Sequence, residues 1–389
     1  MCASVNAGGP VPTADNRSRG TSLGLLSLVD HFADPVTGLA TSPGQRLAEV
    51  VAQGELAERA GFERFAVGEH HFSRYLVPDA HLLLAAVAAR TRSIRLFTAV
   101  TLLPLHDPVR LAEQMGLVDQ LSGGRLEVSV ARGVSEAASA AFGVPGGDGV
   151  YDVMERHLTA LLHHLGSGSA APAPTPLLVG GPDGGAAGAA GNGRGRGGAE
   201  GATELTLVPG VVQRPHPPVW MGSGIHERSI DLAVRHRLPL VLPSLFRHHG
   251  DYLPLVERYR AGRSAQGEEH PPVAFPSYCW VAPTSREARR QWQPRLDHYV
   301  AYAKDYRGGF GRALDFATIV SPGGPGVCGS PAEVADKLGR INEQLGLSHH
   351  LLLMDVGGMP FPLVEAAVEL LAAEVAPQLA SAPSSGSQD

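Results

Sequence analysis

Short apolar runs alternate with longer amphipathic segments along most of the chain. Eight of these runs are almost continuously apolar, which is typical of parallel strands buried on both faces. They lie at residues 23–29, 64–68, 94–100, 125–131, 218–223, 238–244, 273–282 and 350–356. Because helical sequence follows each run, we predict eight βα repeats that close into a (β/α)8 TIM barrel. An open doubly wound sheet is the alternative architecture.

The predicted helices lie at residues 43–60, 80–90, 108–121, 151–165 and 331–346. The last has the clearest ends, because Ser330 is a typical N-cap, Pro331 suits the first helical position and Glu333 completes a capping box. Its predicted buried stripe is Val334, Leu338, Ile341 and Leu345.

Residues 166–204 differ in composition from the rest of the chain. Gly, Ala and Pro make up two-thirds of this segment, and it has no aromatic residue. Such a segment cannot bury enough apolar surface to offset its ordering entropy, so we predict a disordered insertion between strands 4 and 5. Residues 1–21 and 379–389 are predicted tails, which leaves 22–378 as one barrel domain.

The composition narrows the class of protein. Thirty-eight acidic and 32 basic residues leave a net charge of −6, and no basic stripe indicates a nucleic-acid partner. The three cysteines have no CxxC spacing, and their odd number is typical of a reducing compartment. No apolar run is long enough to span a membrane, and the first residues lack a secretory signal. We therefore expect a cytoplasmic protein.

Polar residues that follow a strand of such a barrel lie at its catalytic end. Glu69, His70 and His71 follow the second predicted strand. These side chains could hold a metal or act in proton transfer, or the two histidines could be buried structural residues. Neighbouring residues of an extended segment point in opposite directions, which argues against a metal clamp by both histidines.

Two further segments at this end suggest an anion site. Gly222, Ser223 and Gly224 follow the fifth strand and open a helix, where backbone amides can bind phosphate. Arg132 follows the fourth strand and could contact the same anion, although a surface salt bridge is an equal alternative.

The residues before the fourth strand lie at the opposite, stabilising end of the barrel. We read them as a tight turn with an Asp–Arg contact. They are Asp119, Ser122, Gly123, Gly124 and Arg125.

An ordered set of motifs resembles those of the bacterial luciferase-like flavin-dependent monooxygenases. The motifs lie at 69–72 (EHHF), 103–110 (LPLHDPVR), 119–125 (DQLSGGR), 131–133 (ARG), 213–220 (QRPHPPVW), 329–334 (GSPAEV) and 357–360 (GGMP), with a final helix ending in 374–377 (EVAP). The resemblance covers about 22–378 without the insertion.

This resemblance implies a barrel that binds reduced FMN, or in some branches a deazaflavin, at its catalytic end. By similarity, His70 is the active-site histidine beside the flavin ring. Ala99 and Val100 match a position with a non-prolyl cis peptide beneath that ring.

The cofactor phosphate has its own implied residues. Arg132, with Gly133, matches the phosphate-contacting arginine. Gly222, Ser223 and Gly224 match the turn that holds the same phosphate. Ala131 departs from the true luciferases, which have a cysteine there, and this argues against light emission or long-chain aldehyde oxidation.

The resulting hypothesis is an FMNH2-dependent monooxygenase. It would receive reduced FMN from a separate flavin reductase and use O2 to oxidise a small organic substrate, with secondary metabolism as one setting for this reaction. We expect a homodimer without a metal. The alternatives are a deazaflavin-dependent hydride-transfer oxidoreductase, a non-catalytic flavin-binding subunit and, more distantly, a metal-dependent hydrolase. The glycine-containing segment 305–326 is predicted to be a mobile lid.

Overall fold

A computed structural model describes residues 21–133, 135–167, 207–224, 226–243, 247–306 and 314–381. Most of the predicted insertion, residues 1–20 and residues 382–389 lie outside this description.

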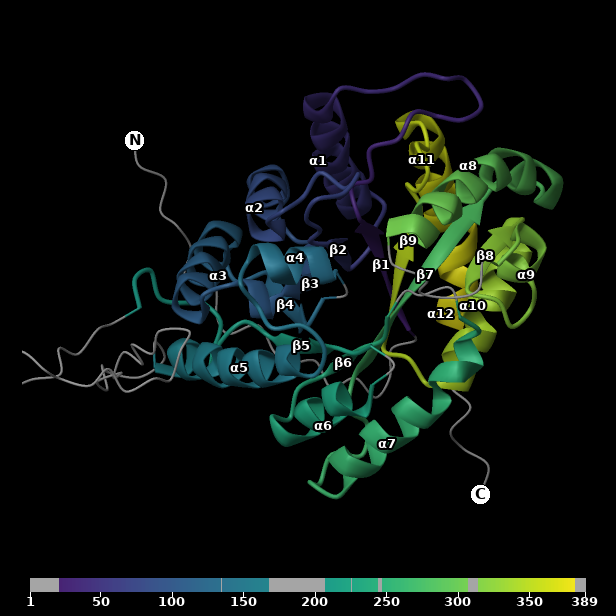
Figure 1. Cartoon of the computed structure of the whole chain (residues 1–389). Coiled ribbons are helices and arrows are strands. Elements are labelled where there is room, and N and C mark those ends of the chain that lie inside the picture. The colour runs from purple at the N-terminus through teal and green to yellow at the C-terminus, as the bar shows by residue number, and fades with distance from the viewer. Residues whose placement is uncertain are drawn as a thin grey trace, which may run out of the picture.

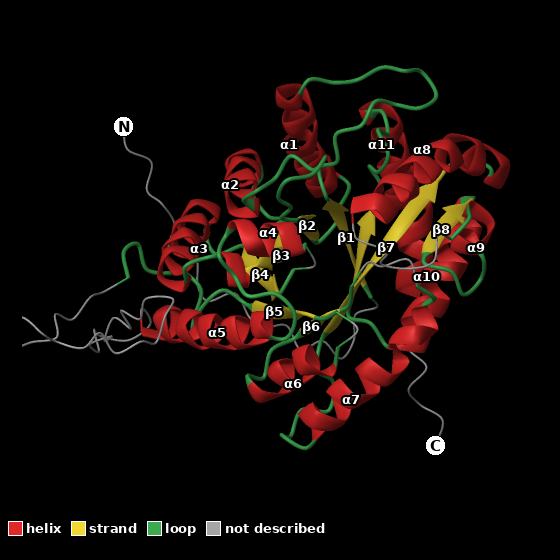
Figure 2. Ribbon diagram, viewed as in Figure 1, coloured by secondary structure: helices red, strands yellow, loops and turns green. Residues whose placement is uncertain are grey.

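Parallel strands form the centre of the molecule, and helices surround them (Figures 1 and 2). Eight strands are hydrogen-bonded in the order β6-β5-β4-β3-β2-β1-β9-β7, and pairing of β6 with β7 closes the ring. The predicted (β/α)8 barrel is therefore confirmed. The strands are β1 Ser22–Ser27, β2 Arg64–Val67, β3 Arg95–Leu102, β4 Leu126–Ala131, β5 Val219–Gly222, β6 Leu240–Val241, β7 Val273–Val281 and β9 His349–Leu353.

The helices form the outer layer of the barrel. In Figure 1, α2 to α5 lie on one side of the barrel and α8 to α10 on the opposite side. The helices are α1 Pro43–Arg59, α2 Ala80–Arg90, α3 Pro108–Ser122, α4 Glu136–Ala141, α5 Gly149–Ser167, α6 Glu227–Arg235, α7 Leu253–Ser264, α8 Ser285–Tyr306, α9 Phe316–Val320, α10 Pro331–Leu345, α11 Phe361–Leu370 and α12 Ala376–Ser381.

Helix α10 follows its sequence closely. Ser330 and Glu333 form the expected capping box, and the helix ends at Gly346 in a left-handed conformation. All four residues of the predicted stripe are buried.

Several boundaries differ from the sequence prediction, most of all in the 238–244 run, where only Leu240 and Val241 form a strand. A further strand, β8 Gly326–Gly329, pairs with the second half of β7 outside the eight-strand ring. Its two terminal glycines give a weak strand signal, and it lies at the end of the segment predicted as a lid. Helices α5 and α12 continue to Ser167 and Ser381, beyond the expected helix and domain ends.

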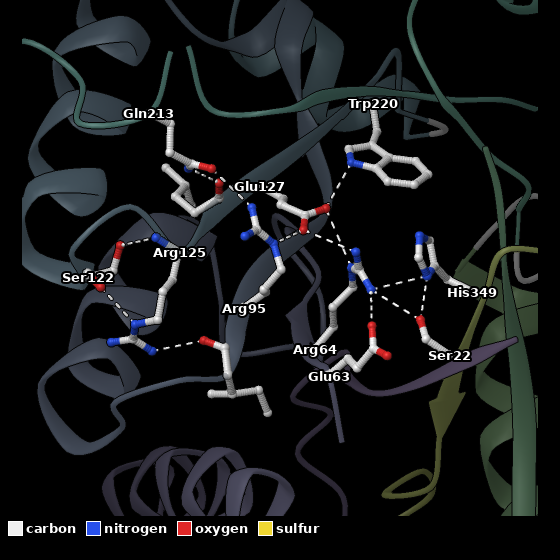
Figure 3. Close-up of polar contacts among 12 residues, drawn as sticks. Ser22, Glu63, Arg64, Arg95, Ser122, Arg125, Glu127, Gln213, Trp220 and His349 are labelled. Carbon is white, nitrogen blue, oxygen red and sulfur yellow. Dashed lines mark hydrogen bonds and ion pairs between the residues drawn. The ribbon is translucent and has the colours of Figure 1, made fainter. Parts of the chain in front are cut away.

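The amino ends of the strands enclose a buried charge network (Figure 3). Glu127 of β4 is 2% exposed, and its carboxylate pairs with the guanidinium groups of Arg64 and Arg95. Trp220 Nε1 donates to Glu127 Oε2 over 3.0 Å, and Arg64 Nη1 lies 3.1 Å from His349 Nδ1. The residues come from five strands, so the network ties the ring together.

The predicted Asp119–Arg125 contact is wrong, although both side chains are structural. Asp119 instead accepts hydrogen bonds from the backbone amides of Val212 and Gln213. Arg125 donates to carbonyl oxygens, including those of Ala88, Thr91, Ile94 and Ser122. The aspartate meets the chain that returns toward β5, while the arginine faces the loop before β3.

Candidate cofactor and active site

The carboxyl ends of β2, β3, β4 and β5 carry the residues predicted to be functional, and these strands are neighbours in the barrel. The structure therefore places His70, Ala99, Val100, Arg132 and the turn 222–224 along one continuous arc of the catalytic end.

His70 follows β2 and is half-buried. Its ring stacks on Tyr75 with 4.1 Å between ring centroids and 23° between planes. Tyr75 Oη donates to Tyr299 Oη over 3.1 Å, so helix α8 supports this stack. His70 N also donates to Val77 O over 2.9 Å, which folds the 69–77 loop onto itself. The histidine is thus held in a defined position.

His71 faces a different environment, as expected for neighbouring residues of an extended segment. Its Nε2 lies 2.9 Å from Glu69 Oε1, and its ring packs edge-on against Phe142 with centroids 4.9 Å apart. This arrangement supports a packing role for His71.

The peptide bond between Ala99 and Val100 is cis, as the family resemblance implied. This bond lies beside the start of the 69–77 loop, hereafter the histidine loop, because Glu69 N donates to Val100 O over 3.3 Å. A Cβ added to Gly68 would lie 3.0 Å from Ala99 O, so the glycine allows this close approach.

Gly222 brings the end of β5 against the same peptide. A Cβ at this position would lie 2.9 Å from Val100 Cγ1 and 3.0 Å from Ala131 Cβ. The structure therefore gives Gly222 a packing role. Ser223 Oγ donates to Gly224 O over 2.6 Å, so its hydroxyl is engaged within the turn.

A pocket of about 300 Å³ opens beside the end of β4. Gly133, at φ +80°, lies in its wall next to Arg132. The wall also contains the starts of α5 and α6. Its lining residues are Arg132, Gly133, Ser135, Glu136, Ser139, Gly146, Gly147, Asp148, Val150, Tyr151 and His226. Gly222, Ser223 and Gly224 come shortly before His226 in the sequence but are not among the lining residues.

Tyr151 is the residue of this pocket that sequence reasoning missed. It is 4% exposed, and within the described part of the chain its Oη has no hydrogen-bond partner. Two guanidinium groups lie close to its ring, with Arg132 Cζ 5.3 Å and Arg228 Cζ 4.9 Å from the ring centroid. A buried hydroxyl without a partner is costly, so a ligand that accepts its hydrogen bond would relieve that cost.

The pocket has further features that suit an anion. Helices α5 and α6 begin at its wall, and their first amides carry partial positive charge. His226, the N-cap of α6, makes no side-chain capping bond there. Glu136 and Asp148 give the wall a mixed charge. The anion would therefore contact Arg132, Tyr151 and the helix ends.

The remaining predictions at this end concern metals and the lid. Among the residues that the structure describes, no group of three or more His, Cys, Asp or Glu side chains is arranged to hold a metal ion. The predicted lid falls partly on 307–313, which lies outside the described residues, and its second half contains α9 and ends at Gly326, the first residue of β8. In the described ranges, no helix combines the length and the apolar character needed to cross a membrane.

Solved structures share this architecture. Monooxygenase RslO1 from Streptomyces bottropensis superposes with a TM-score of 0.73 at 24% identity, covering 92% of this chain and 99% of that one. The oxygenating constituent of 3,6-diketocamphane monooxygenase from Pseudomonas putida, in complex with FMN, gives 0.68 at 19% identity, covering 92% and 98%. A coenzyme F420-dependent tetrahydromethanopterin reductase from Methanopyrus kandleri gives 0.64 at 16% identity, covering 93% and 99%. At these identities the likeness shows the fold.

Curated relatives match shorter stretches. The chain is 36% identical over 103 residues to 4-hydroxyprotoasukamycin monooxygenase of Streptomyces nodosus subsp. asukaensis, which is 26% of this chain and 28% of that protein. It is 33% identical over 86 residues to the oxygenase component of the flavin-dependent trigonelline monooxygenase of Acinetobacter baylyi, which is 22% and 24% respectively. The matched stretches span about a quarter of these relatives.

The described residues define a (β/α)8 barrel protein with a histidine, a cis peptide and a pocket suited to an anion along one arc of its catalytic end. The model of the luciferase-like monooxygenase family matches residues 22–349. The chain therefore belongs to that family.

Proposed function

We propose that this protein is a monooxygenase that binds reduced FMN supplied by a separate flavin reductase and uses O2 to oxidise a small organic substrate. The observation that carries the proposal is the pocket at Arg132 and Tyr151, on the same arc as His70 and the Ala99–Val100 cis peptide. A flavin with a terminal phosphate has a ring at one end and an anion at the other, and this arc offers a place for each.

The residues of this arc fit FMN in their chemistry. Arg132, Tyr151 Oη and the amide ends of α5 and α6 would hold the phosphate. Gly133 and the turn at Gly222, Ser223 and Gly224 would shape the wall beside it. Ala99 and Val100 would lie under the ring. When bound, reduced FMN supplies the electrons that activate O2, and the protein orients the reactants and excludes water.

His70 would hold and move a proton at the reacting centre. An imidazole changes its charge near working pH, so it can donate to a developing oxygen anion and accept the proton back. Stacking on Tyr75 fixes the plane of its ring, which limits the directions in which it can donate.

A deazaflavin-dependent hydride-transfer oxidoreductase is the second candidate, because an F420-dependent reductase has the same fold. The two functions differ in cofactor and in O2 use. Titration of the protein with FMN, riboflavin and F420, followed by O2 consumption with chemically reduced FMN, separates them. Tight FMN binding, weaker riboflavin binding and O2-dependent product formation are expected. F420 binding without O2 use would overturn the proposal.

We further propose a location, an oligomeric state and a role for the 166–204 segment. The protein would act as a cytoplasmic homodimer that meets its reductase transiently. Residues 166–204 would be dispensable for flavin binding, which a deletion variant checks by FMN titration.

A further inference from the structure

A buried carboxylate lies directly behind the histidine loop. The Glu69 side chain is fully buried, and His106 Nε2 lies 2.9 Å from each of its oxygens. His71 Nε2 lies 2.9 Å from Oε1, and the backbone amide of Leu102 donates to Oε2 over 3.0 Å. This carboxylate therefore joins the loop after β2 to the end of β3.

Glu69 holds the chain at two points just after the cis peptide. Its backbone N–H donates to Val100 O over 3.3 Å, and its side chain accepts from Leu102 N two residues later. The next residue along the chain is His70. Any movement of Glu69 would thus change the spacing between the histidine and the Ala99–Val100 peptide.

Two imidazoles, those of His106 and His71, face the Glu69 carboxylate with Nε2 at 2.9 Å, and His106 contacts both of its oxygens. Burial opposes the protonation of His106, but Glu69 and Asp79 raise the pKa of His106 above its ordinary value. Burial would raise the pKa of Glu69, but the bonds from His106, His71 and Leu102 hold it below its usual range. The other titratable groups around this pair are His71 on the loop and His81, which lies 3.5 Å from Asp79 on α2.

We infer that Glu69 and His106 form a buried ion pair that positions His70 and the Ala99–Val100 peptide relative to each other for cofactor binding. The role rests on the proposed function, and both residues act through the backbone that they hold. They are positioning residues, whereas His70 is the residue proposed to act on the reacting atoms.

The pair has a predictable pH dependence. Because the pKa of His106 is raised in the folded protein, the ion pair is complete below the ordinary histidine value and is lost as pH rises through the raised value. Losing the charge should loosen the register between the loop and β3. FMN affinity should therefore fall on the alkaline side by about tenfold, the scale of one charge-assisted hydrogen bond.

The experiment combines FMN titration with histidine NMR across pH, in the full-length protein and three variants. Glu69→Gln should lower the His106 titration midpoint and reduce FMN affinity at every pH. His106→Gln keeps a donor but removes the charge, so it should flatten the alkaline decline. In the cofactor-free wild type, the His70 resonance should show a second inflection at the His106 midpoint, and this inflection should vanish in Glu69→Gln.

Glu58→Gln is the matched control, because Glu58 also accepts backbone hydrogen bonds, from Arg92, Ser93 and Ile94, but it lies near the amino end of β3. It should lower stability and leave the FMN pH profile unchanged. The inference would be overturned if His106→Gln kept the wild-type FMN affinity and pH profile. It would also be overturned if the His70 resonance did not change as His106 titrates. Failure of the wild type to bind FMN would count against the proposed function, while the NMR comparison would still decide the ion pair. If Glu69→Gln does not fold, His106→Gln carries both readouts.

Discussion

Two buried polar groups, one at each end of the barrel, differ in whether the protein itself satisfies them. At the amino end, Glu127 is enclosed by Arg64, Arg95 and Trp220, so its charge is matched within the protein. At the carboxyl end, Tyr151 Oη is buried with no partner in the described chain, and two guanidinium groups lie near the tyrosine ring. Removing one partner of an internally matched charge destabilises the fold, whereas an unmatched donor beside a pocket indicates where a ligand completes the hydrogen bonding.

The largest expected effect is on chemistry at the carboxyl end. His70→Ala should fold and bind FMN, because the proposed phosphate contacts lie on other strands. Substrate oxidation should slow by about 10²–10⁴-fold, or roughly 3–6 kcal/mol of barrier, with electrons lost to hydrogen peroxide. Product and peroxide yields with chemically reduced FMN measure this.

His71→Ala is the control for that experiment. It removes a donor to Glu69, so it should mainly lower stability. Normal product formation by His70→Ala together with its loss in His71→Ala would mean that the proton-transferring histidine is the second one.

The next largest effect concerns the buried charge network at the amino end of the barrel. Glu127→Ala leaves Arg64 and Arg95 without their buried partner, which should cost about 3–5 kcal/mol of unfolding free energy in urea denaturation. FMN affinity of the folded fraction should stay at the wild-type value. A large loss of affinity would show that the two ends are energetically coupled.

Acid denaturation of the wild-type protein tests the contribution of the same carboxylate. Burial would raise the pKa of Glu127, but Arg64 and Arg95 lower it to about 2. Its stabilising contribution is therefore present above its ordinary value and is lost as pH falls toward 2. Glu127→Gln should be less stable at neutral pH and less sensitive to acid between pH 4.5 and 2, measured by circular dichroism.

A smaller effect is expected at the proposed phosphate contact. Arg132→Ala should weaken FMN binding by about 1.5–3 kcal/mol, the scale of a hydrogen bond to a charged group. Riboflavin, which lacks the phosphate, should lose much less. Equal losses for both ligands in fluorescence titrations would remove Arg132 from the phosphate site.

The smallest expected effect concerns the Tyr151 hydroxyl. Tyr151→Phe keeps the ring beside the two arginines and removes only the unmatched hydroxyl. FMN should bind about 1 kcal/mol more weakly, while the cofactor-free protein should be equally or more stable because a buried unpaired group is gone. A loss of stability with unchanged FMN affinity would mean that the hydroxyl has a structural partner.

The sequence predicts the barrel well, because seven of the eight ring strands carry a local signal that the structure keeps nearly intact. The segment 238–244 is the exception, since only Leu240 and Val241 form β6. Pro239 and Pro243 flank this strand, and proline cannot donate to a strand ladder.

The site is only partly readable from sequence. His70, Arg132 and the Ala99–Val100 peptide belong to recognisable motifs. Tyr151 starts a predicted amphipathic helix, so its pattern indicates a core residue. Its unpaired hydroxyl depends on how the start of α5 packs beside Arg132 and Arg228. Glu69 follows a strand, but its importance comes from His106, which lies 37 positions later in the chain. Such pairings follow from tertiary packing and leave no local trace.

Helix α5 has a consequence for rebuilding the protein. It begins at the pocket, where Val150 and Tyr151 lie, and runs for 19 residues. At 1.5 Å per residue it carries the chain about 28 Å away before residue 168. The chain returns beside helix α3, where Pro209 O would lie 2.3 Å from a Cβ at Gly116. A reporter domain, or new termini made by circular permutation, could therefore be engineered between residues 167 and 207 at a site remote from the chemistry.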